Sequence, residues 1–202
     1  METIQSLGLV LGTAFASGLN IYATVATLGL LHEYGVVTLP APLLPLAHPA
    51  VIVLATVLFA VEFVADKLPI VDTAWDVAHT LIRPPAAALL AFAAVSTVPE
   101  PWPLVAALLA GGVALTAHGA KASTRAAVNV SPEPFTNWTL SLGEDAAAVG
   151  LTWLALAHPF LAAGLVAVLL VGAIVLLALL FRFLRGALRA LGGRRTGPAP
   201  AA

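Results

Sequence analysis

The ionisable residues of this chain gather in two short stretches that lie between long apolar runs. The first stretch covers residues 62–83 and the second covers residues 118–145. A charged side chain is costly in hydrocarbon, so polar residues in such surroundings mark an ion or substrate path, a binding site or a buried pair. We therefore expect the chemistry of this protein in these two stretches.

Four polar residues of the first stretch share one helical face. Asp72, Asp76, His79 and Arg83 stand at i, i+4, i+7 and i+11, and the residues between them are mostly apolar. Such a stripe either faces the interior of a helix bundle or forms the solvated side of a helix at the membrane surface.

Two further carboxylates precede this stripe and lie one helical turn apart. Glu62 stands inside an apolar run, and Asp66 follows it, directly before Lys67. Two desolvated carboxylates at this spacing tend to share a proton, which would suit proton coupling. The alternative is a buried pair with Lys67, Lys121 or Arg125 that only holds helices together.

The second stretch carries a complementary, mainly basic stripe. Its members stand at i, i+3, i+7 and i+11: His118, Lys121, Arg125 and Asn129. After a proline-containing break at 131–135, polar residues return at roughly helical spacing: Asn137, Ser141, Glu144 and Asp145. The two stripes form either a network of ion pairs between helices or the walls of a polar cavity, and the large number of ionisable groups favours the cavity. Asn20, in the first apolar run, is placed to reach it.

A metal site is a weaker hypothesis for the first stripe. Asp72, Asp76 and His79 could offer two carboxylates and an imidazole from one helix face, and Mg²⁺ prefers oxygen ligands while keeping waters for phosphate. The fuller motifs of enzymes that act on lipid phosphates are missing. Transport therefore ranks above catalysis, and the sequence indicates no particular cofactor.

The elements that carry these residues have the composition of membrane helices. Of the 202 residues, 60% are hydrophobic and 9% are charged, whereas soluble domains carry about 25% charged residues. Several apolar runs reach the roughly 20 residues that span a bilayer. We expect an all-α, polytopic transmembrane helix bundle of about six spans: 4–31, 49–66, 73–98, 103–128, 136–157 and 159–184. Pro84 and Pro85 are expected to break the third span into two half-helices, and re-entrant segments would suit the same pattern.

The basic residues predict the orientation of these spans. Lys and Arg occur in the connections near 67–83 and 118–135 and in the C-terminal tail, but not in the other connections. The positive-inside rule then places both termini and both charged stretches on the cytoplasmic side. One transmembrane domain over 1–186 and a basic, disordered tail over 187–202 follow. An odd number of spans is the alternative, if a charged segment is re-entrant.

Small residues suggest two further features of the bundle. Residues 16–20 resemble residues 117–121 in their small-polar-glycine pattern, which would suit a three-plus-three inverted repeat. Gly8, Gly12 and Ala16 stand four residues apart and predict a close helix approach. That approach serves either ordinary packing or a homo-oligomer.

Three segments resemble the DUF4126 family of bacterial membrane proteins of unknown function. They are AFASGLNIYATVATLGLL (14–31), VEFVADKLPIVDTAWDVAHTLIRPPA (61–86) and HGAKASTRAAVNVSPEPFTNWTLSLGED (118–145). Within them, five residues look like the central motif of the family: Glu62, Pro69, Asp72, Asp76 and Pro84. The resemblance implies a multi-pass protein of the bacterial inner membrane and implies no reaction.

The leading hypothesis from the sequence is a small transporter, channel or flippase. It would move a polar or anionic solute through a charged, cytoplasm-facing cavity, with a coupled proton on Glu62 or Glu144. One alternative is an intramembrane, metal-dependent enzyme acting on a lipid phosphate. The other is a non-catalytic membrane partner protein whose charges only pair. The expected surroundings are the lipid bilayer and a small polar, ionic or lipid-phosphate ligand, with no nucleic acid.

Overall fold

The computed structural model describes residues 2–129 and 134–193, and the chain in these ranges is helical with short connections. The helices are α1 (Glu2–Leu19), α2 (Ile21–Glu33), the short 3-10 helix η1 (Ala41–Ala47), α3 (Pro49–Ala65), α4 (Pro69–Ala94), α5 (Trp102–Val128), α6 (Pro134–Ala157) and α7 (Pro159–Gly193). No strand occurs in the described ranges, so the all-α prediction is confirmed.

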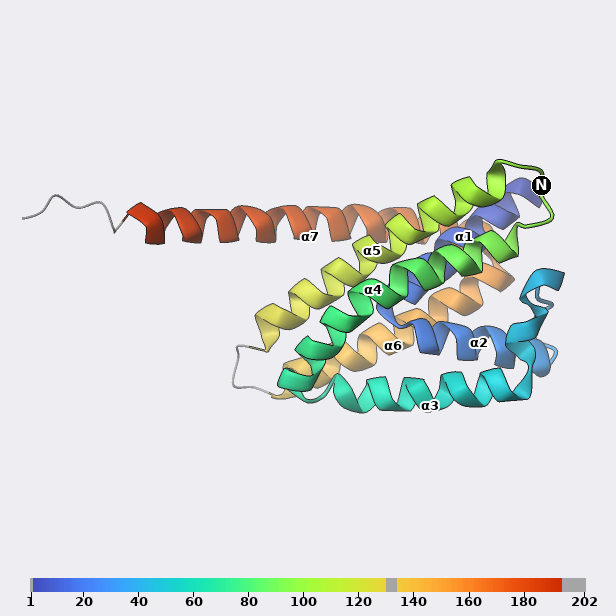
Figure 1. The fold of residues 1–202 in the computed structure, drawn as a ribbon, viewed down its shortest axis with the longest axis horizontal. Helices are drawn as coiled ribbons and strands as arrows, with labels where there is room; N and C mark the ends of the chain where they lie inside the picture. The colour runs from blue at the N-terminus through green and yellow to red at the C-terminus, as the bar shows by residue number, and fades with distance from the viewer. Residues whose placement is uncertain (1, 130–133, 194–202) are drawn as a thin grey trace, which may run out of the picture.

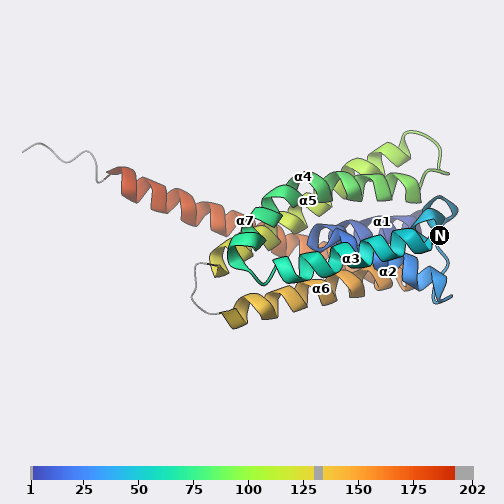
Figure 2. The ribbon, with the colours of Figure 1, turned by 60° about the horizontal axis from the view of Figure 1, so that its bottom comes forward.

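Helices α3 to α7 run back and forth along the bundle (Figure 1). The α3–α4 connection, the end of α5 and the start of α6 lie at one end, and η1 with the α4–α5 and α6–α7 connections lies at the other. The C-terminal part of α7 extends beyond the bundle in both views (Figures 1 and 2). The start of α1 and the end of α7 lie at opposite ends, which differs from the predicted placement of both termini on one side.

Helices α1 and α2 form a hairpin instead of the continuous span predicted over 4–31. The chain turns at Asn20, inside the bundle, and both helices run from there toward the end that carries the N-terminus (Figures 1 and 2). The prediction of one span was wrong because hydrophobicity does not register a helix break made by one residue. Asn20 has an extended backbone (φ −155°, ψ 104°), and its side chain caps α2.

Four helices are long and apolar enough to cross a membrane, and a fifth span is formed if one bent pair is counted. The four are Ile70–Ala94, Trp102–Val128, Phe135–Ala157 and Pro159–Gly186. The bent pair joins η1 to α3 at an angle of 65°. Several apolar helices thus indicate a membrane protein, whereas the predicted count of six and the inverted repeat are not confirmed.

Helix α4 stays continuous through Pro84 and Pro85, so the predicted break at these prolines was wrong. A proline removes a backbone donor but need not end a membrane helix when neighbours pack closely against it. Helix α5 supplies such a neighbour, because the Cβ position of Gly111 lies 3.5 Å from the Pro84 carbonyl oxygen. Residues 131–133 of the predicted proline-containing break lie outside the described residues, and Pro134 begins α6.

The small residues of α1 bring it against α6 and α7 at the centre of the bundle. A Cβ on Gly8 would lie 2.1 Å from the Pro159 carbonyl oxygen, and one on Gly12 would lie 2.5 Å from the Cβ of Ala155. Ala16 is fully buried. The close approach that the spacing predicted is therefore made within the chain, while a homo-oligomer through this face stays a prediction.

The C-terminal end of α7 also differs from the domain boundary that the sequence predicted. Helix α7 continues to Gly193, past the predicted domain limit at 186. Residues 194–202 lie outside the described part of the chain.

Candidate ion and substrate site

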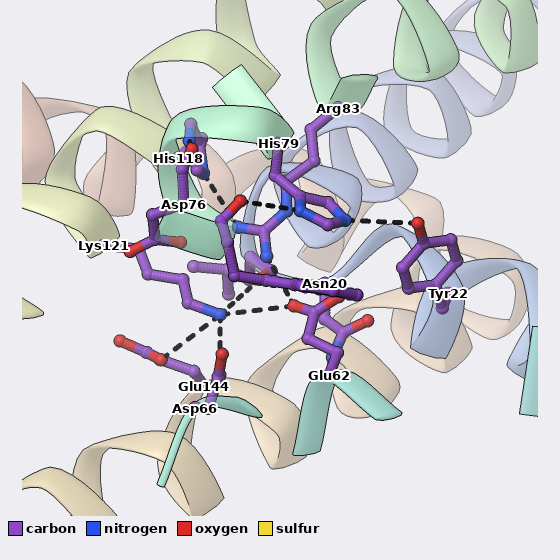
Figure 3. A network of polar contacts seen from close by, with 12 residues as sticks. Asn20, Tyr22, Glu62, Asp66, Asp76, His79, Arg83, His118, Lys121 and Glu144 are labelled. Carbon is purple, nitrogen blue, oxygen red and sulfur yellow. Dashed lines mark hydrogen bonds and ion pairs between the residues drawn. The ribbon is translucent and has the colours of Figure 1, made fainter. Parts of the chain in front are cut away.

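The two charged stretches meet inside the bundle, around the tip of the α1–α2 hairpin (Figure 3). Twelve of the predicted site residues are at most 6% exposed: Asn20, Glu62, Asp66, Asp72, Asp76, His79, Arg83, His118, Lys121, Arg125, Asn137 and Asp145. The stripe on α4 thus faces the bundle interior, which excludes the alternative of a helix solvated at the membrane surface. Glu144 is slightly exposed, with 13% of its side chain accessible.

Arg83 connects α4 to α1, α3 and α5. Its guanidinium pairs with Glu62 and donates from Nη1 to the Gly18 carbonyl oxygen at 3.0 Å and to His118 Nδ1 at 2.8 Å. A guanidinium only donates, so Nδ1 of His118 is the acceptor. The His118 proton therefore lies on Nε2, which donates to the Asp76 carbonyl oxygen at 3.0 Å.

Lys121 of α5 is surrounded by four oxygen atoms from three other helices and their ends. Its Nζ lies 3.0 Å from Asp66 Oδ2, 3.4 Å from Glu62 Oε1 and 3.7 Å from Glu144 Oε2. It also donates to the Leu19 carbonyl oxygen at 3.1 Å. This single ammonium joins the hairpin tip to α3, α5 and α6 (Figure 3).

Arg125, one turn further along α5, binds the C-terminal end of α3. Nη2 lies 2.7 Å from Asp66 Oδ2, and Nη1 donates to the Asp66 carbonyl oxygen at 2.8 Å. The guanidinium also pairs with Glu144 at 3.0 Å and donates to Asn137, both on α6. Asp72 Oδ1 of α4 lies 3.7 Å from Arg125 Nη1. Such multidentate guanidinium contacts fix geometry as well as charge.

The hairpin tip presents the ends of two half-helices to this network. The carbonyl groups of Gly18 and Leu19, at the end of α1, accept from Arg83 and Lys121. At the start of α2, Asn20 Oδ1 accepts from the Ala23 amide, and Asn20 Nδ2 donates to Asp145 Oδ1 at 2.9 Å. Cations thus face a helix C-terminus and a carboxylate faces a helix N-terminus, as the helix dipoles favour.

Buried carboxylates outnumber buried cations at the site. The six carboxylates are Glu62, Asp66, Asp72, Asp76, Glu144 and Asp145, and the three cations are Arg83, Lys121 and Arg125. Five carboxylates each have a buried oxygen with no hydrogen-bond partner among the described residues: Glu62 Oε2, Asp66 Oδ1, Asp72 Oδ1, Asp76 Oδ1 and Asp145 Oδ2. Buried charge without compensation is unfavourable, so protons or a bound cation are expected to balance it.

Two predicted site residues lie at the margin of the network. Lys67 donates to the Phe63 carbonyl oxygen at 2.8 Å and covers the Phe63 ring, with Nζ 3.0 Å from its centroid. Partial burial lowers the pKa of the Lys67 ammonium. Asn129, at the end of α5, donates to Asp72 Oδ2 at 2.6 Å.

The proposed metal ligands on α4 do not converge. Asp72 faces Asn129, whereas His79 Nδ1 donates to the Trp75 carbonyl oxygen at 2.8 Å. The other His79 nitrogen lies 3.2 Å from the Tyr22 hydroxyl. Within the described ranges, no three His, Asp or Glu side chains are arranged to hold a metal ion.

A small cavity lies at the edge of the network. This cavity, of about 180 Å³, lies between α4 and α5 and is lined by Thr73, Asp76, Val77, Thr80, Ala122, Arg125 and Ala126. A second, of about 280 Å³, lies at the α6–α7 turn, around His158. The described residues thus show the ion-pair network, whereas a polar cavity walled by the two stripes stays a prediction.

Sequence reasoning missed the backbone contribution to this site. The carbonyl groups of Gly18 and Leu19 carry no sequence signal of their own, although an Asn after a small-residue run is a helix-cap signal that could have located the break. Thr80 was also missed. It stands one turn after Asp76 on the polar stripe, and its hydroxyl lies 2.9 Å from His118 Nε2.

Comparison with known proteins identifies the family of this chain. No curated protein and no solved structure matches it. The family model described as "Domain of unknown function (DUF4126)" matches residues 7–179, which include the tip of the hairpin and all members of the charged network. The chain therefore belongs to the DUF4126 family.

Proposed function

We propose that this protein is a small proton-coupled membrane transporter, whose substrate path passes the tip of the α1–α2 hairpin. The observation that carries the proposal is the pair of half-helix ends at Asn20, buried among ionisable side chains. Transporters commonly build ion and substrate sites from discontinuous helices, whose free termini contact the ligand. A purely structural core has no need of such a break.

The excess of buried carboxylates supports protons as the coupling ion. Glu62 and Glu144 are each within ion-pair distance of two cations. Asp76 is 5% exposed, and no described cation lies within ion-pair distance of its carboxylate. Asp76 can therefore hold a proton without the loss of an ion pair, whereas protonation of Glu62 or Glu144 would free a cation.

The cargo in this proposal is a polar or anionic solute, or a lipid headgroup. Each cation of the network is already held by carboxylates, so an anionic group has to displace one of them. Protonation of that carboxylate would release the cation for the anion, which would couple the two movements. Paired charges with different protonation states are a recurrent feature of intramembrane proton relays.

The proposed location is the bacterial inner membrane. The basic residues Lys67, Lys121 and Arg125 lie toward the bundle end that carries the α3–α4 connection and the end of α5. The positive-inside rule would place this end, with the C-terminus of α7, in the cytoplasm. The N-terminus of α1 would then lie on the opposite side.

Proteoliposomes that contain a trapped pH-sensitive dye test the transport proposal. We expect phosphate, glycine or ethanolamine to elicit proton movement with the wild-type protein, and Asp76→Asn to reduce its rate at least tenfold. Glu100→Gln, which removes an exposed carboxylate at the far end of α4 and α5, serves as the matched control. Wild-type liposomes as proton-tight as empty ones with every solute would overturn the proposal.

The alternative of a non-catalytic membrane partner protein predicts wild-type liposomes with no solute-driven proton movement. The metal-dependent enzyme has no converging ligand set among the described residues to support it.

A further inference from the structure

The cavity between α4 and α5 has the features of a binding site for one charged group. With about 180 Å³ it has room for several water molecules. Thr73, Asp76 and Thr80 line one wall. They stand at i−3, i and i+4 on α4, so they share one helical face.

Asp76 is the residue of this cavity that lacks a counter-charge. Its side chain is buried, and its Oδ1 has no hydrogen-bond partner among the described residues. The neighbouring guanidinium of Arg125 is engaged by Asp66 and Glu144, and that of Arg83 by Glu62. A cationic group that enters the cavity would therefore meet an available carboxylate.

The surrounding groups favour an ammonium over a metal ion. A primary ammonium has three donors, and the carboxylate of Asp76 with the hydroxyl oxygens of Thr73 and Thr80 offers acceptors for them. Metal ions such as Ca²⁺ and Mg²⁺ take about six oxygen ligands, and no group of three His, Asp or Glu side chains is arranged for one in the described ranges.

We propose that this cavity binds a primary ammonium group, with Asp76 as its counter-ion. The inference deepens the proposed transport function and rests on it only for the claim that the ligand moves. The ammonium has two sources, a lipid headgroup or a free amine. Val77 at the cavity is 68% exposed and Leu81 one turn beyond is 80% exposed, so this face of α4 borders lipid. Arg125 on the opposite wall would face the phosphate of an ethanolamine lipid.

Thermal unfolding of the purified full-length protein, followed through its four tryptophans, tests the binding directly. Ethanolamine, choline and sodium chloride are compared at equal ionic strength, because choline carries the positive charge without N–H donors. Phosphatidylethanolamine and phosphatidylcholine nanodiscs with matched acyl chains form the lipid arm. Asp76→Asn and Glu100→Gln are measured beside the wild type. Since no described hydrogen bond or ion pair involves the Asp76 carboxylate, Asp76→Asn is expected to fold.

We expect the midpoint of unfolding to rise by several degrees with an ethanolamine compound, in the wild type and Glu100→Gln but not in Asp76→Asn. A rise with free ethanolamine identifies a soluble amine, and a rise confined to phosphatidylethanolamine identifies a lipid headgroup. An equal rise with choline or sodium, a rise that Asp76→Asn retains, or no rise in either arm would overturn the site.

The two proposals fail separately. Ammonium binding without flux in proteoliposomes would remove the transport function and leave the site. Solute-driven proton flux without ammonium binding would remove the ammonium site and leave the transport function.

Discussion

Arg125 and Asp66 are joined through both the side chain and the main chain of the aspartate. Arg125 Nη2 lies 2.7 Å from Asp66 Oδ2, and Nη1 lies 2.8 Å from the Asp66 carbonyl oxygen. Asp66 is the C-cap residue of α3, so this pair fastens the end of α3 to α5. The guanidinium thus satisfies a helix-end carbonyl and a buried carboxylate at the same time.

Removal of this guanidinium should destabilise the fold strongly. We expect Arg125→Ala to lower the free energy of unfolding by about 3–5 kcal/mol, because Asp66 keeps a buried charge with one partner fewer. Arg125→Lys should recover only part of this loss, since an ammonium cannot reproduce the planar fork. Denaturant unfolding in detergent measures both. Arg182→Ala, at an exposed position of α7, is the control, and equal losses at the two arginines would contradict the prediction.

The cap at the hairpin tip should matter more than an ordinary helix cap. Asn20→Ala removes the cap of α2, worth about 1 kcal/mol. It also leaves Asp145 without its amide donor, worth a further ~1–3 kcal/mol for a buried group. His48→Ala removes an exposed cap from α3, so it should lower the free energy of unfolding by only the ~1 kcal/mol of an ordinary cap. The measurement compares the losses of unfolding free energy caused by Asn20→Ala and His48→Ala. Equal losses would contradict the additional contact of Asn20 with Asp145.

The crossing of α1 and α5 depends on a glycine. A Cβ at Gly18 would lie 2.5 Å from the Ala114 carbonyl oxygen and 2.7 Å from the Cβ of Ala117. We expect Gly18→Ala to cost about 1–3 kcal/mol of stability through overpacking. It should also lower transport, because the adjacent carbonyl contacts Arg83.

The control for this substitution lies on α5. Gly112 has no atom within 4 Å of its Cβ position, so Gly112→Ala should be neutral or stabilise the helix by up to about 1 kcal/mol. Equal stability of the two variants would contradict the close approach of α1 to α5 at Gly18.

The hairpin predicts an odd number of membrane crossings. Because α1 and α2 return to the bundle end from which they start, we expect the start of α1 and the end of α7 on opposite sides of the membrane. An N-terminal and a C-terminal epitope tag should therefore differ in protease accessibility in oriented vesicles, with only the N-terminal tag cleaved from outside. A single introduced cysteine at Leu68, in a chain that has none, supplies an internal reference for the cytoplasmic end. Equal protection of both tags would contradict the hairpin topology.

The sequence by itself determined the membrane character, most helix ends and the separation of charge into two stripes. Long apolar runs and proline-rich connections act locally, so they place α3, α5, α6 and the start of α7 almost where the structure has them. Helical spacing likewise assigns Asp72, Asp76, His79 and Arg83 to one face, because periodicity along one helix needs no knowledge of its neighbours.

Only the tertiary structure decided how these parts combine. The direction taken by the chain after Asn20 depends on contacts with α5 and α6, which lie about a hundred residues away in the sequence. The continuity of α4 through Pro84 likewise depends on close packing by α5. The choice of partners among six carboxylates and three cations rests on distances of a few ångströms between different helices. For that reason, the stripes were visible in the sequence, whereas the unpaired state of Asp76 was not.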